Sequence, residues 1–444
     1  MTGRSSGLNR FLLNLIANLI LILSAGIAAS VGNHSVAADH LISIASPSPW
    51  QVIQRVGFDP SNAVNAEPGN SAFGYAQIEV SGILPDEMPA NSTLQYRLIL
   101  INDGNGKSID WTSVAPTAFD LQEGAFQFPV IVAAGGWYRL ELATSDDAVE
   151  FRASGIVEPF GVGEVFVIAG QSYATNTNEE RLRVSDPHGR VSALNVAGST
   201  WATAHDPQPT PDGSDGGSIW PALGDSLLQH FQVPIGFANV AVGGTSSKQW
   251  MPDGTLHPRL KQAGTQLGRF RAVLWQQGES DVIAKTTIEE YVRNLQTIRK
   301  SAVRSWGFEP VWLAAKSTHH PTVYNDPAGE RRIRQATEQL WTLPGFGVGP
   351  DTDVLTGENR GDQNSRRHFS AVGQRRAAAL WRVVLACRLS ETPAGIDAAS
   401  FLLPDLHLLS PVWNSEIVHR ESSILRRSEE GAPIDVNLAF VHNG

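Results

Sequence analysis

The chain has 444 residues, of which 42% are hydrophobic and 18% charged, so it is long enough for two or three globular domains and too apolar for a disordered protein. Its formal net charge of −10 gives no support to a nucleic-acid partner, which basic clusters would normally reveal. A single cysteine, Cys387, excludes an intramolecular disulfide. A small neutral or organic substrate fits this composition best.

The N-terminal residues 1–38 have the pattern of an export signal. Arg4 and Arg10 precede an apolar run over 11–29, and "SVAA" at 35–38 provides small residues for cleavage. We therefore expect a protein that is secreted or located in the periplasm or cell envelope. The apolar run is also close to the length of a membrane span, so an uncleaved anchor is the alternative and the only expected route to a membrane.

Residues 41–160 show strand-like alternation of apolar and polar residues. The segments "YAQIEVSG", "LQYRLILI", "AFQFPVIVA" and "GWYRLELA" are separated by turn clusters such as "NDGNGK" and "ATSDD". Many short strands with such spacing are typical of an all-β sandwich. We predict a sandwich-like domain here and find no catalytic constellation in it.

Residues 161–390 alternate between strand and helix patterns, which predicts an α/β domain with a parallel sheet. The clearest helices are 287–305, with Thr286 and Glu289 as a capping box, and 327–342, with Asp326 as its N-cap. The expected strands are 164–170, 235–242, 271–277, 310–317 and 346–350.

Two other segments lack such a pattern. Residues 183–217 are rich in Gly, Pro, Asp and Ser and predict a long loop over one end of the sheet. Residues 391–444 form a C-terminal extension to which the sequence assigns no role.

Chemically useful side chains follow the predicted strands, at the edge of the sheet where ligands bind in open α/β folds. The first strand runs into "GQSYA", in which Gly170 permits a sharp turn before Ser172. The later segments are "GGTSSKQW" with Gly243 and Gly244, "LWQQGESD" with Gln277 and Glu279, and "HFSAVG" with His368 at the start of a helix.

These residue types suit hydrolysis of an ester. A serine hydroxyl becomes a nucleophile when a base takes its proton, and histidine is suited to this near neutral pH. The oxyanion that follows needs fixed donors, which glycine N–H groups and an amide side chain can supply. We therefore predict Ser172 as nucleophile, His368 as base, and Gly243, Gly244 and Gln277 as oxyanion donors.

The same blocks, in the same order, resemble the SGNH (GDSL-like) hydrolases over residues 161–387. Within them, "GQSYA" and "WQQGESD" are most similar to the sialate O-acetylesterase and acetylxylan-esterase branch. The resemblance implies a flavodoxin-like three-layer α/β/α domain, an accessory β domain, no metal or cofactor, and removal of acetyl groups from carbohydrate.

The chain departs from the family pattern at two positions. Tyr173 stands where the family has an asparagine, and Ser365 stands where it commonly has an aspartate three residues before the histidine. The third member of the triad is therefore open. Our first candidate is Glu279, and the alternatives are Asp362, Asp351, Asp353 or a Ser–His dyad held by a backbone carbonyl.

Other conspicuous residues have simpler interpretations. His319 and His320 are adjacent, so their side chains point in different directions and do not favour a metal site. Three tryptophans could stack on sugar rings, but core or lid positions fit them better, and a group of arginines fits a solvated loop. These residues are Trp201, Trp250, Trp275, Arg360, Arg366 and Arg367.

Three functions are compatible with these observations. The first is a secreted serine esterase that removes O-acetyl groups from carbohydrate through an acyl-enzyme. The second is an inactive, carbohydrate-binding homologue, which the missing aspartate would favour. The third is a lipase or thioesterase on the same fold, although the polar loops near the motifs favour a short acyl group.

Overall fold

The computed structural model describes residues 41–59, 71–85, 92–102, 104–120, 124–146, 150–361 and 367–389. The chain from Leu41 onward clusters into one compact unit. The predicted signal segment 1–38 and the extension 391–444 lie outside the described residues. Within these ranges, no helix combines the length and apolar character needed to cross a membrane.

Antiparallel strands form the first part of this unit. β3 (Tyr75–Ile83) and β7 (Ala125–Ala133) pair along their whole length and bury alternate side chains, as the sequence pattern predicts. They lie between β1 (Ser43–Ser46) and β6 (Phe119–Asp120) in a four-stranded sheet. A second group contains β2 (Val52–Gln54), β4 (Thr93–Leu100), β5 (Ile109–Ser113) and β8 (Gly135–Asp146).

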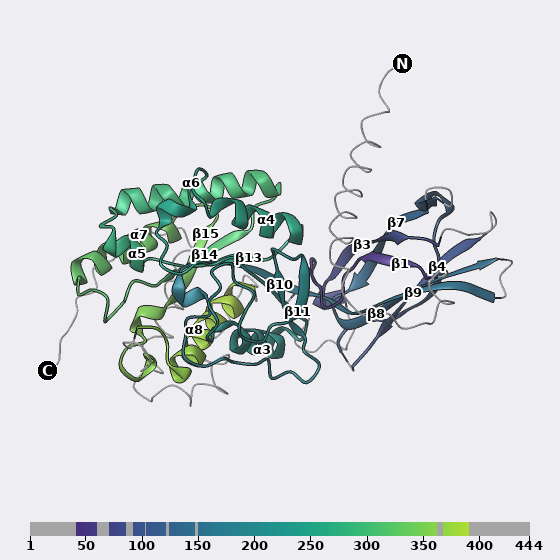
Figure 1. The fold of residues 1–444 in the computed structure, drawn as a ribbon, viewed down its shortest axis with the longest axis horizontal. Coiled ribbons are helices and arrows are strands. Elements are labelled where there is room, and N and C mark those ends of the chain that lie inside the picture. Colours follow the sequence, from purple (N-terminus) through teal and green to yellow (C-terminus); the bar gives the residue numbers. More distant parts are fainter. Residues whose placement is uncertain are drawn as a thin grey trace, which may run out of the picture. The chain divides into compact units, whose positions relative to one another are not determined.

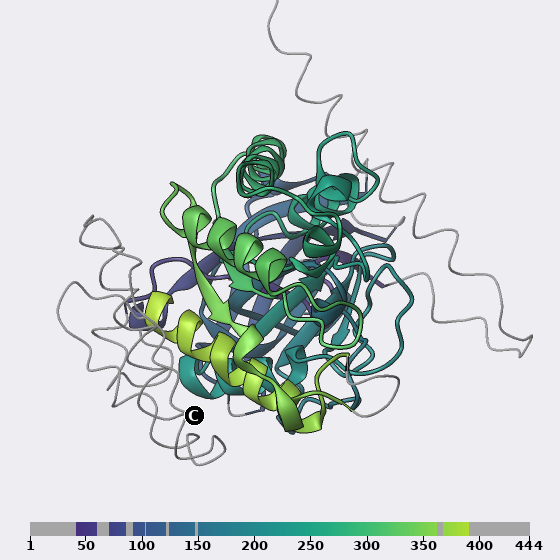
Figure 2. The same cartoon turned by 90° about the vertical axis from the view of Figure 1, so that its left-hand side faces the viewer.

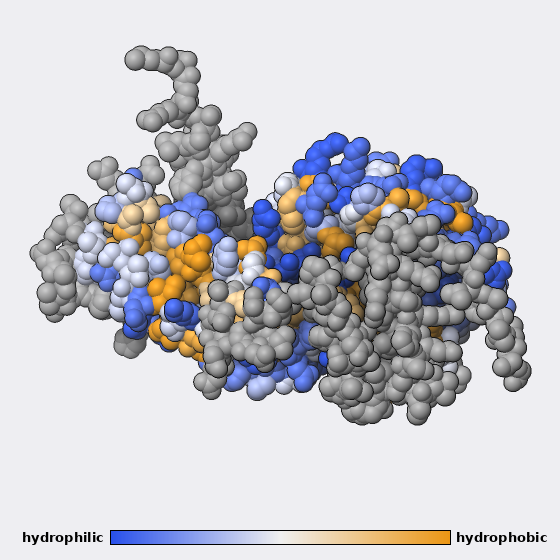
Figure 3. All heavy atoms as spheres, turned by 180° about the vertical axis from the view of Figure 1, so that it is seen from behind, coloured by the Kyte–Doolittle hydropathy of each residue, from blue (hydrophilic) through white to orange (hydrophobic). Residues whose placement is uncertain are grey.

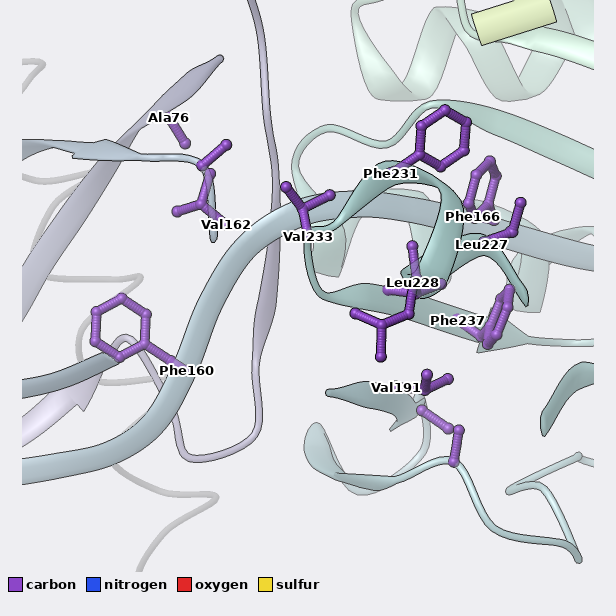
Figure 4. Close-up of a cluster of buried hydrophobic side chains, with 14 of the residues drawn as sticks. Ala76, Phe160, Val162, Phe166, Val191, Leu227, Leu228, Phe231, Val233 and Phe237 are labelled. Carbon is purple, nitrogen blue, oxygen red and sulfur yellow. The ribbon is translucent and has the colours of Figure 1, made fainter. Parts of the chain in front are cut away.

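The strand β9 (Glu150–Gly170) belongs to both parts of the unit. Its first half pairs with β8 in antiparallel fashion, and its last residues pair in parallel with β12 and β13. The buried side chains continue across this strand, from Phe160 and Val162 to Phe166 (Figure 4). The domain boundary that we placed between residues 160 and 161 therefore lies inside one continuous strand.

The second part is a mixed α/β fold built on a parallel sheet. The parallel strands are arranged in the order β10-β12-β9-β13-β14-β15. Without the edge strand β10, this is the 2-1-3-4-5 order of flavodoxin-like sheets. The bounds are β10 (Val191–Asn195), β12 (Ile235–Asn239), β13 (Ala272–Gln276), β14 (Val311–Lys316) and β15 (Phe346–Asp351).

The prediction of one long loop over 183–217 is wrong in part. The segment contains β10 and β11 (Thr200–Thr203), which form an antiparallel pair at the edge of the sheet. The two strands are only five and four residues long, so their alternation is hidden among turn residues. The remainder, from 204 to 217, runs as irregular chain toward the site described below.

Helices cover both faces of the parallel sheet, as Figures 1 and 2 show. On one face, α3 (Trp220–Phe231) and α8 (Ala371–Leu389) pack together. On the other face lie α4 (His257–Leu267), α6 (Ile288–Trp306) and α7 (Pro327–Trp341). Two hydrophobic clusters, one under each helical layer, fill the space between helices and sheet.

Helix ends follow the expected capping rules with one shift. Asp326 caps α7 by accepting a hydrogen bond from the Gly329 N–H, as predicted. For α6 the N-cap is Thr287 rather than Thr286, because it is the Thr287 hydroxyl that accepts from the Glu290 N–H.

Apolar side chains remain on the surface at scattered positions. On the face drawn in Figure 3, orange patches of apolar residues alternate with blue hydrophilic ones. The most exposed large examples are Leu41, which precedes β1, and Ile131, Ile283 and Ile156, which belong to three different elements. Isolated exposed residues of this kind are normal for a folded protein.

Candidate active site

A glycine turn positions Ser172 directly after the central strand β9. Gly170 has φ +141°, and a Cβ there would lie 2.0 Å from the carbonyl oxygen of Gln276, so only glycine fits. Ser172 then begins the short helix η3 (Ser172–Ala174). Within the described structure, neither its hydroxyl nor its backbone N–H has a hydrogen-bond partner.

This turn lies where the strand order reverses, between β9 and β13. In doubly wound sheets, ligands bind in the crevice beyond the carboxyl ends of the strands at this switch point. Gln171 joins the two strand ends, because its side-chain oxygen accepts hydrogen bonds from the Ser280 N–H at 3.1 Å and the Gln277 amide at 3.2 Å. The serine turn is therefore fixed to the neighbouring strand end.

The segment carrying His368 packs against the same turn. The Tyr173 ring contacts the His368 ring edge-on, with ring centroids 5.2 Å apart. The Asn178 side-chain oxygen accepts a hydrogen bond of 3.1 Å from the Phe369 N–H. The serine and histidine blocks, almost two hundred residues apart in sequence, are thus brought together as predicted.

The imidazole of His368 is neutral at physiological pH. Its pKa is lowered to about 3, mainly by burial and in addition by the neighbouring His320, Arg367 and Arg360. Its Nε2 atom is buried and has no hydrogen-bond partner in the part of the chain that the structure describes. In the described structure no hydrogen bond joins this ring to Ser172, but a neutral imidazole is the form that can accept a proton.

The prediction that Glu279 orients His368 is contradicted by its contacts. Glu279 lies at the start of α5 (Glu279–Ile283) and is fully buried, and its Oε1 accepts a 2.6 Å hydrogen bond from the Ser317 hydroxyl. Its Oε2 has no hydrogen-bond partner among the described residues, and burial raises its pKa to about 8. A carboxyl that is neutral and turned to Ser317 cannot stabilise an imidazolium.

The carboxylates of "GPDTD" have other partners as well. Asp353 accepts hydrogen bonds from the N–H groups of Thr318 and His319, at 2.7 and 2.9 Å, and pairs with Arg334. Asp351 pairs with the same arginine. Asp353 therefore holds the loop after β14, Asp351 is held by Arg334 of α7, and Asp362 lies outside the described residues.

Two of the three expected oxyanion donors, Gln277 and Gly243, already donate hydrogen bonds to other groups. The Gln277 amide nitrogen donates to Thr245 O at 3.1 Å and to the Asp281 carboxylate at 2.6 Å, so it is not free for an oxyanion. Gly243 lies next to the nucleophile, because a Cβ added to it would be 3.8 Å from Ser172 Cβ. Its N–H, however, donates to the Asp212 carboxylate at 2.9 Å.

Gly244 is the predicted donor that stays open. It has φ +72°, and a Cβ there would meet no atom within 4 Å. Among the described residues its N–H has no hydrogen-bond partner. The donors left at this edge are therefore the backbone N–H groups of Gly244 and Ser172.

The substitution of Tyr173 for asparagine has a structural consequence. Its hydroxyl donates to the carbonyl oxygen of Arg367 and accepts from the Arg360 guanidinium. A third contact joins it to His319 O at 3.1 Å. Arg360 is consequently buried rather than solvated, and Tyr173 ties the serine turn to the backbone next to His368.

The remaining expectations concern aromatic residues and metals. Trp250 and Trp275 are buried in the core below the site, and Trp201 is half-buried beside Gly236. The Nδ1 atom of His319 lies 3.4 Å from a carboxylate oxygen of Glu330. No group of three or more metal-ligating side chains occurs in the described part of the chain. Arg366 lies outside that part.

Sequence reasoning did not find Gln171, Asn176 or Asp212. These residues lie in the segments "GQSYATNTN" and "PDGSD". The only signal in the sequence is that both segments are rich in polar and turn-forming residues. The Asn176 amide donates to Gln208 O and Thr210 Oγ1, at 2.8 and 3.0 Å, and so fixes the second segment beside the first. These contacts depend on chain proximity that local patterns do not encode.

The geometry is that of a mixed α/β enzyme whose serine, glycine and histidine segments meet at the switch point of the sheet. Residues 162–378 match the family model described as "Carbohydrate esterase, sialic acid-specific acetylesterase". The match confirms the predicted family and the class of enzyme, a carboxylic ester hydrolase. No curated protein matches the chain.

Solved structures similar to the chain include three hydrolases. A carbohydrate acetylesterase from Xanthomonas citri is 15% identical, with a TM-score of 0.47, covering 76% of this chain and 72% of that one. A lipase/acylhydrolase from Enterococcus faecalis is 12% identical, with a TM-score of 0.35 and coverages of 52% and 100%. A carbohydrate acetylesterase from Sinorhizobium meliloti is 11% identical, with a TM-score of 0.32 and coverages of 48% and 94%. The family assignment rests on the sequence match.

Proposed function

We propose that the protein removes O-acetyl groups from a carbohydrate and that Ser172 is its nucleophile. The observation that carries this proposal is the glycine turn at Gly170, which leaves a serine hydroxyl with no hydrogen-bond partner among the described residues, at the switch point of the sheet. A hydroxyl with no structural role, close to Gly243, is free to react. The matched family supplies the acetyl ester as the substrate class.

In the proposed reaction, the Ser172 oxygen bonds to the acetyl carbonyl carbon while its proton moves to His368 Nε2. The carbonyl π electrons move to oxygen, and the N–H groups of Gly244 and Ser172 stabilise that oxyanion. Collapse of the tetrahedral intermediate breaks the bond to the sugar oxygen, which takes the proton from His368. Water then repeats the sequence on the acetyl-serine, releasing acetate and regenerating the hydroxyl.

The proposal requires Ser172 and His368 to approach each other when substrate binds. Catalytic hydrogen bonds are often long in unliganded enzymes and shorten in the substrate complex. Within the described residues no carboxylate orients His368, so we assign its positioning to the packing of Tyr173 and the backbone contact at Phe369. The mechanism we propose is therefore a serine–histidine dyad.

We also propose that the enzyme acts outside the cytoplasm. The basis is the sequence of residues 1–38, with two arginines before a long apolar run. Fractionation of cells that express the full chain tests this: acetylesterase activity should appear in the medium, periplasm or envelope. Activity confined to the cytoplasm would refute export without affecting the catalytic proposal.

The catalytic test is Ser172→Ala, with Ser305→Ala as a matched control that removes an exposed hydroxyl from α6. We expect Ser172→Ala to lose at least a thousandfold in acetate release from acetylated glycans, with an unchanged fold, because the acyl-enzyme cannot form. A fluorophosphonate probe should label Ser172 in the parent and in the control. Residual activity above a tenth would exclude this nucleophile.

One observation favours a second candidate, an inactive carbohydrate-binding homologue. Within the described ranges, the Nε2 atom of His368 has no hydrogen-bond partner and no carboxylate orients the ring. If the parent protein neither releases acetate nor reacts with the probe, yet binds acetylated glycans, this second function holds. Comparison of acetyl with octanoyl esters separately excludes or supports a lipase or thioesterase.

A further inference from the structure

A carboxylate from outside the recognised motifs touches the glycine turn beside the nucleophile. Asp212 Oδ2 accepts a hydrogen bond of 2.9 Å from the Gly243 N–H. A Cβ built on Gly243 would lie 3.3 Å from this oxygen and 3.8 Å from Ser172 Cβ, so the three residues meet at one place. None of the assigned catalytic steps uses Asp212.

The other carboxylate oxygen of Asp212 is held within its own loop. Oδ1 accepts hydrogen bonds from the Thr210 hydroxyl at 2.9 Å and from the Ser214 hydroxyl at 2.7 Å. Burial would raise the pKa of Asp212, but the hydrogen bonds from Ser214, Gly243 and Thr210 outweigh it and lower the pKa. Asp212 is therefore a charged and fully oriented acceptor.

This loop is in turn attached to the nucleophile turn. Asn176, four residues after Ser172, accepts a hydrogen bond of 2.7 Å from the Gln208 N–H through its side-chain oxygen. Its amide donates to Ser214 O at 3.0 Å, and its own N–H donates to the Ser214 hydroxyl at 3.1 Å. The chain of contacts runs from the serine turn, through Asn176 and the loop, to Asp212 and Gly243.

We propose that Asp212 is a positioning residue for the oxyanion hole: by engaging the Gly243 N–H it fixes the glycine turn, so that the next N–H, that of Gly244, is held for the acyl oxygen. The inference rests on the proposed esterase function. Gly244 benefits from such support, because its φ is positive, a Cβ there would meet no atom within 4 Å, and among the described residues its own N–H makes no hydrogen bond that would fix its direction. An oxyanion donor contributes only when its direction is fixed before the reaction.

Three variants and one control test the inference. Asp212→Ala removes the hydrogen bond, and Asp212→Asn keeps an oxygen that can accept it while removing the charge. Asp212→Glu keeps the charge and moves the oxygen by about one bond length. The matched control is Asp215→Ala, which removes a carboxylate of the same loop whose side chain is 87% exposed.

We expect Asp212→Ala to lower kcat on the order of a hundredfold with KM within about threefold, because only the transition state uses the oxyanion donors. Its rate of inactivation by a fluorophosphonate should fall by a similar factor, since the phosphonyl oxygen occupies the same position. Asp212→Asn should stay within about tenfold of the parent, and Asp215→Ala should match it. If Asp212→Ala does not fold, Asp212→Glu must show the same split, with kcat reduced about tenfold or more.

Other outcomes would overturn the inference. Higher kcat in both Asp212→Ala and Asp212→Asn would mean that the charge opposes the oxyanion instead of positioning its donors. A lower melting temperature with unchanged kcat per folded molecule would mean a purely structural role. If Ser172→Ala retains activity, the proposed function fails; if Ser172→Ala is inactive while Asp212→Ala equals the parent, only the role of Asp212 fails.

Discussion

Glu279 is fully buried and His368 is half-buried at the same edge of the sheet, and burial moves their pKa values in opposite directions. It lowers the pKa of the histidine to about 3 and raises the pKa of the glutamic acid to about 8, because in each case the neutral form is favoured. Because Glu279 is neutral, it provides no carboxylate charge that could stabilise the imidazolium form of His368. The two groups therefore need separate tests.

At this scale we predict that Glu279→Gln keeps acetylesterase activity within about fivefold at pH 7, since the amide can still accept from Ser317. A triad acid would lose about 10⁴-fold on the same change. Because the folded pKa lies above the unfolded value, the contribution of Glu279 to stability is full below pH 4.5 and is lost as pH rises through about 8.

Unfolding by denaturant at pH 6 and pH 9 measures this second effect. Between the two pH values, the free energy of unfolding should fall more in the parent than in Glu279→Gln. Only the parent has a carboxyl group at this position, and burial opposes its ionisation in the folded state. Equal losses in the two proteins would show that Glu279 does not titrate in this range. A thousandfold loss of activity would restore it as the acid of a triad.

Residue identities at the site were predictable where chemistry restricts the choice. A serine after a glycine turn and a histidine before a helix are visible in the sequence, and the structure places them together. The acid was not predictable, since several carboxylates follow the strands and their partners are decided by packing. Asp212 was missed because its partner Gly243 is 31 residues away and the contact depends on how the intervening chain folds.

The turn between β9 and η3 is the element on which the site depends. Gly170→Ala should reduce activity at least a hundredfold and destabilise the fold, because its Cβ would collide with Gln276 O at 2.0 Å. The matched control is Gly307→Ala at the end of α6, with φ +73° and no atom within 4 Å of an added Cβ. It should cost only about 1–2 kcal/mol and leave activity unchanged.

Melting temperature and acetate release of the two variants check this pair. If Gly170→Ala is as active as Gly307→Ala, the close approach to Gln276 is not required for function.

At the scale of elements the sequence predicted most strands and helix caps, because periodicity and capping are local properties. It missed β10 and β11, since short strands among Gly and Pro residues carry too little alternation to be recognised.

Across the whole unit, the buried Glu164 connects strands from both parts. Its carboxylate pairs with Arg55, next to β2, and with Arg271, before β13, each at 2.7 Å. Burial would raise the pKa of Glu164, but the two arginine charges outweigh it and lower the pKa. Arg55 and Glu164 have fully buried side chains, so neither can replace its partner with water.

We predict that Glu164→Gln destabilises the protein by about 3–5 kcal/mol, because it leaves a buried guanidinium without its counter-charge. The control is Glu158→Gln, which changes a 46% exposed carboxylate on the same strand, 3.7 Å from Arg139, and should cost at most about 1 kcal/mol. Denaturant unfolding followed by tryptophan fluorescence and circular dichroism measures both. Similar costs for the two variants would contradict the prediction.

The domain boundary was the feature least accessible from the sequence. The change from strand patterns to alternating strands and helices is real, but it marks a change of pairing partners along β9 and not a break in the chain. The residue pattern of a segment indicates which elements it forms. It does not indicate whether one strand pairs with strands of two different sheets.

The continuity of β9 also restricts how this gene could have been assembled or divided. A joint placed near residue 161, where the sequence pattern changes, would cut a hydrogen-bonded strand of 21 residues and separate Glu164 from Arg55. Recombination with another esterase at that point would therefore join two half-strands from different parents, and mismatched pairing would leave open sheet edges, which tend to aggregate. Exchange of the N-terminal strands between relatives is expected to succeed only when the whole of β9 is inherited together with its partners on both sides.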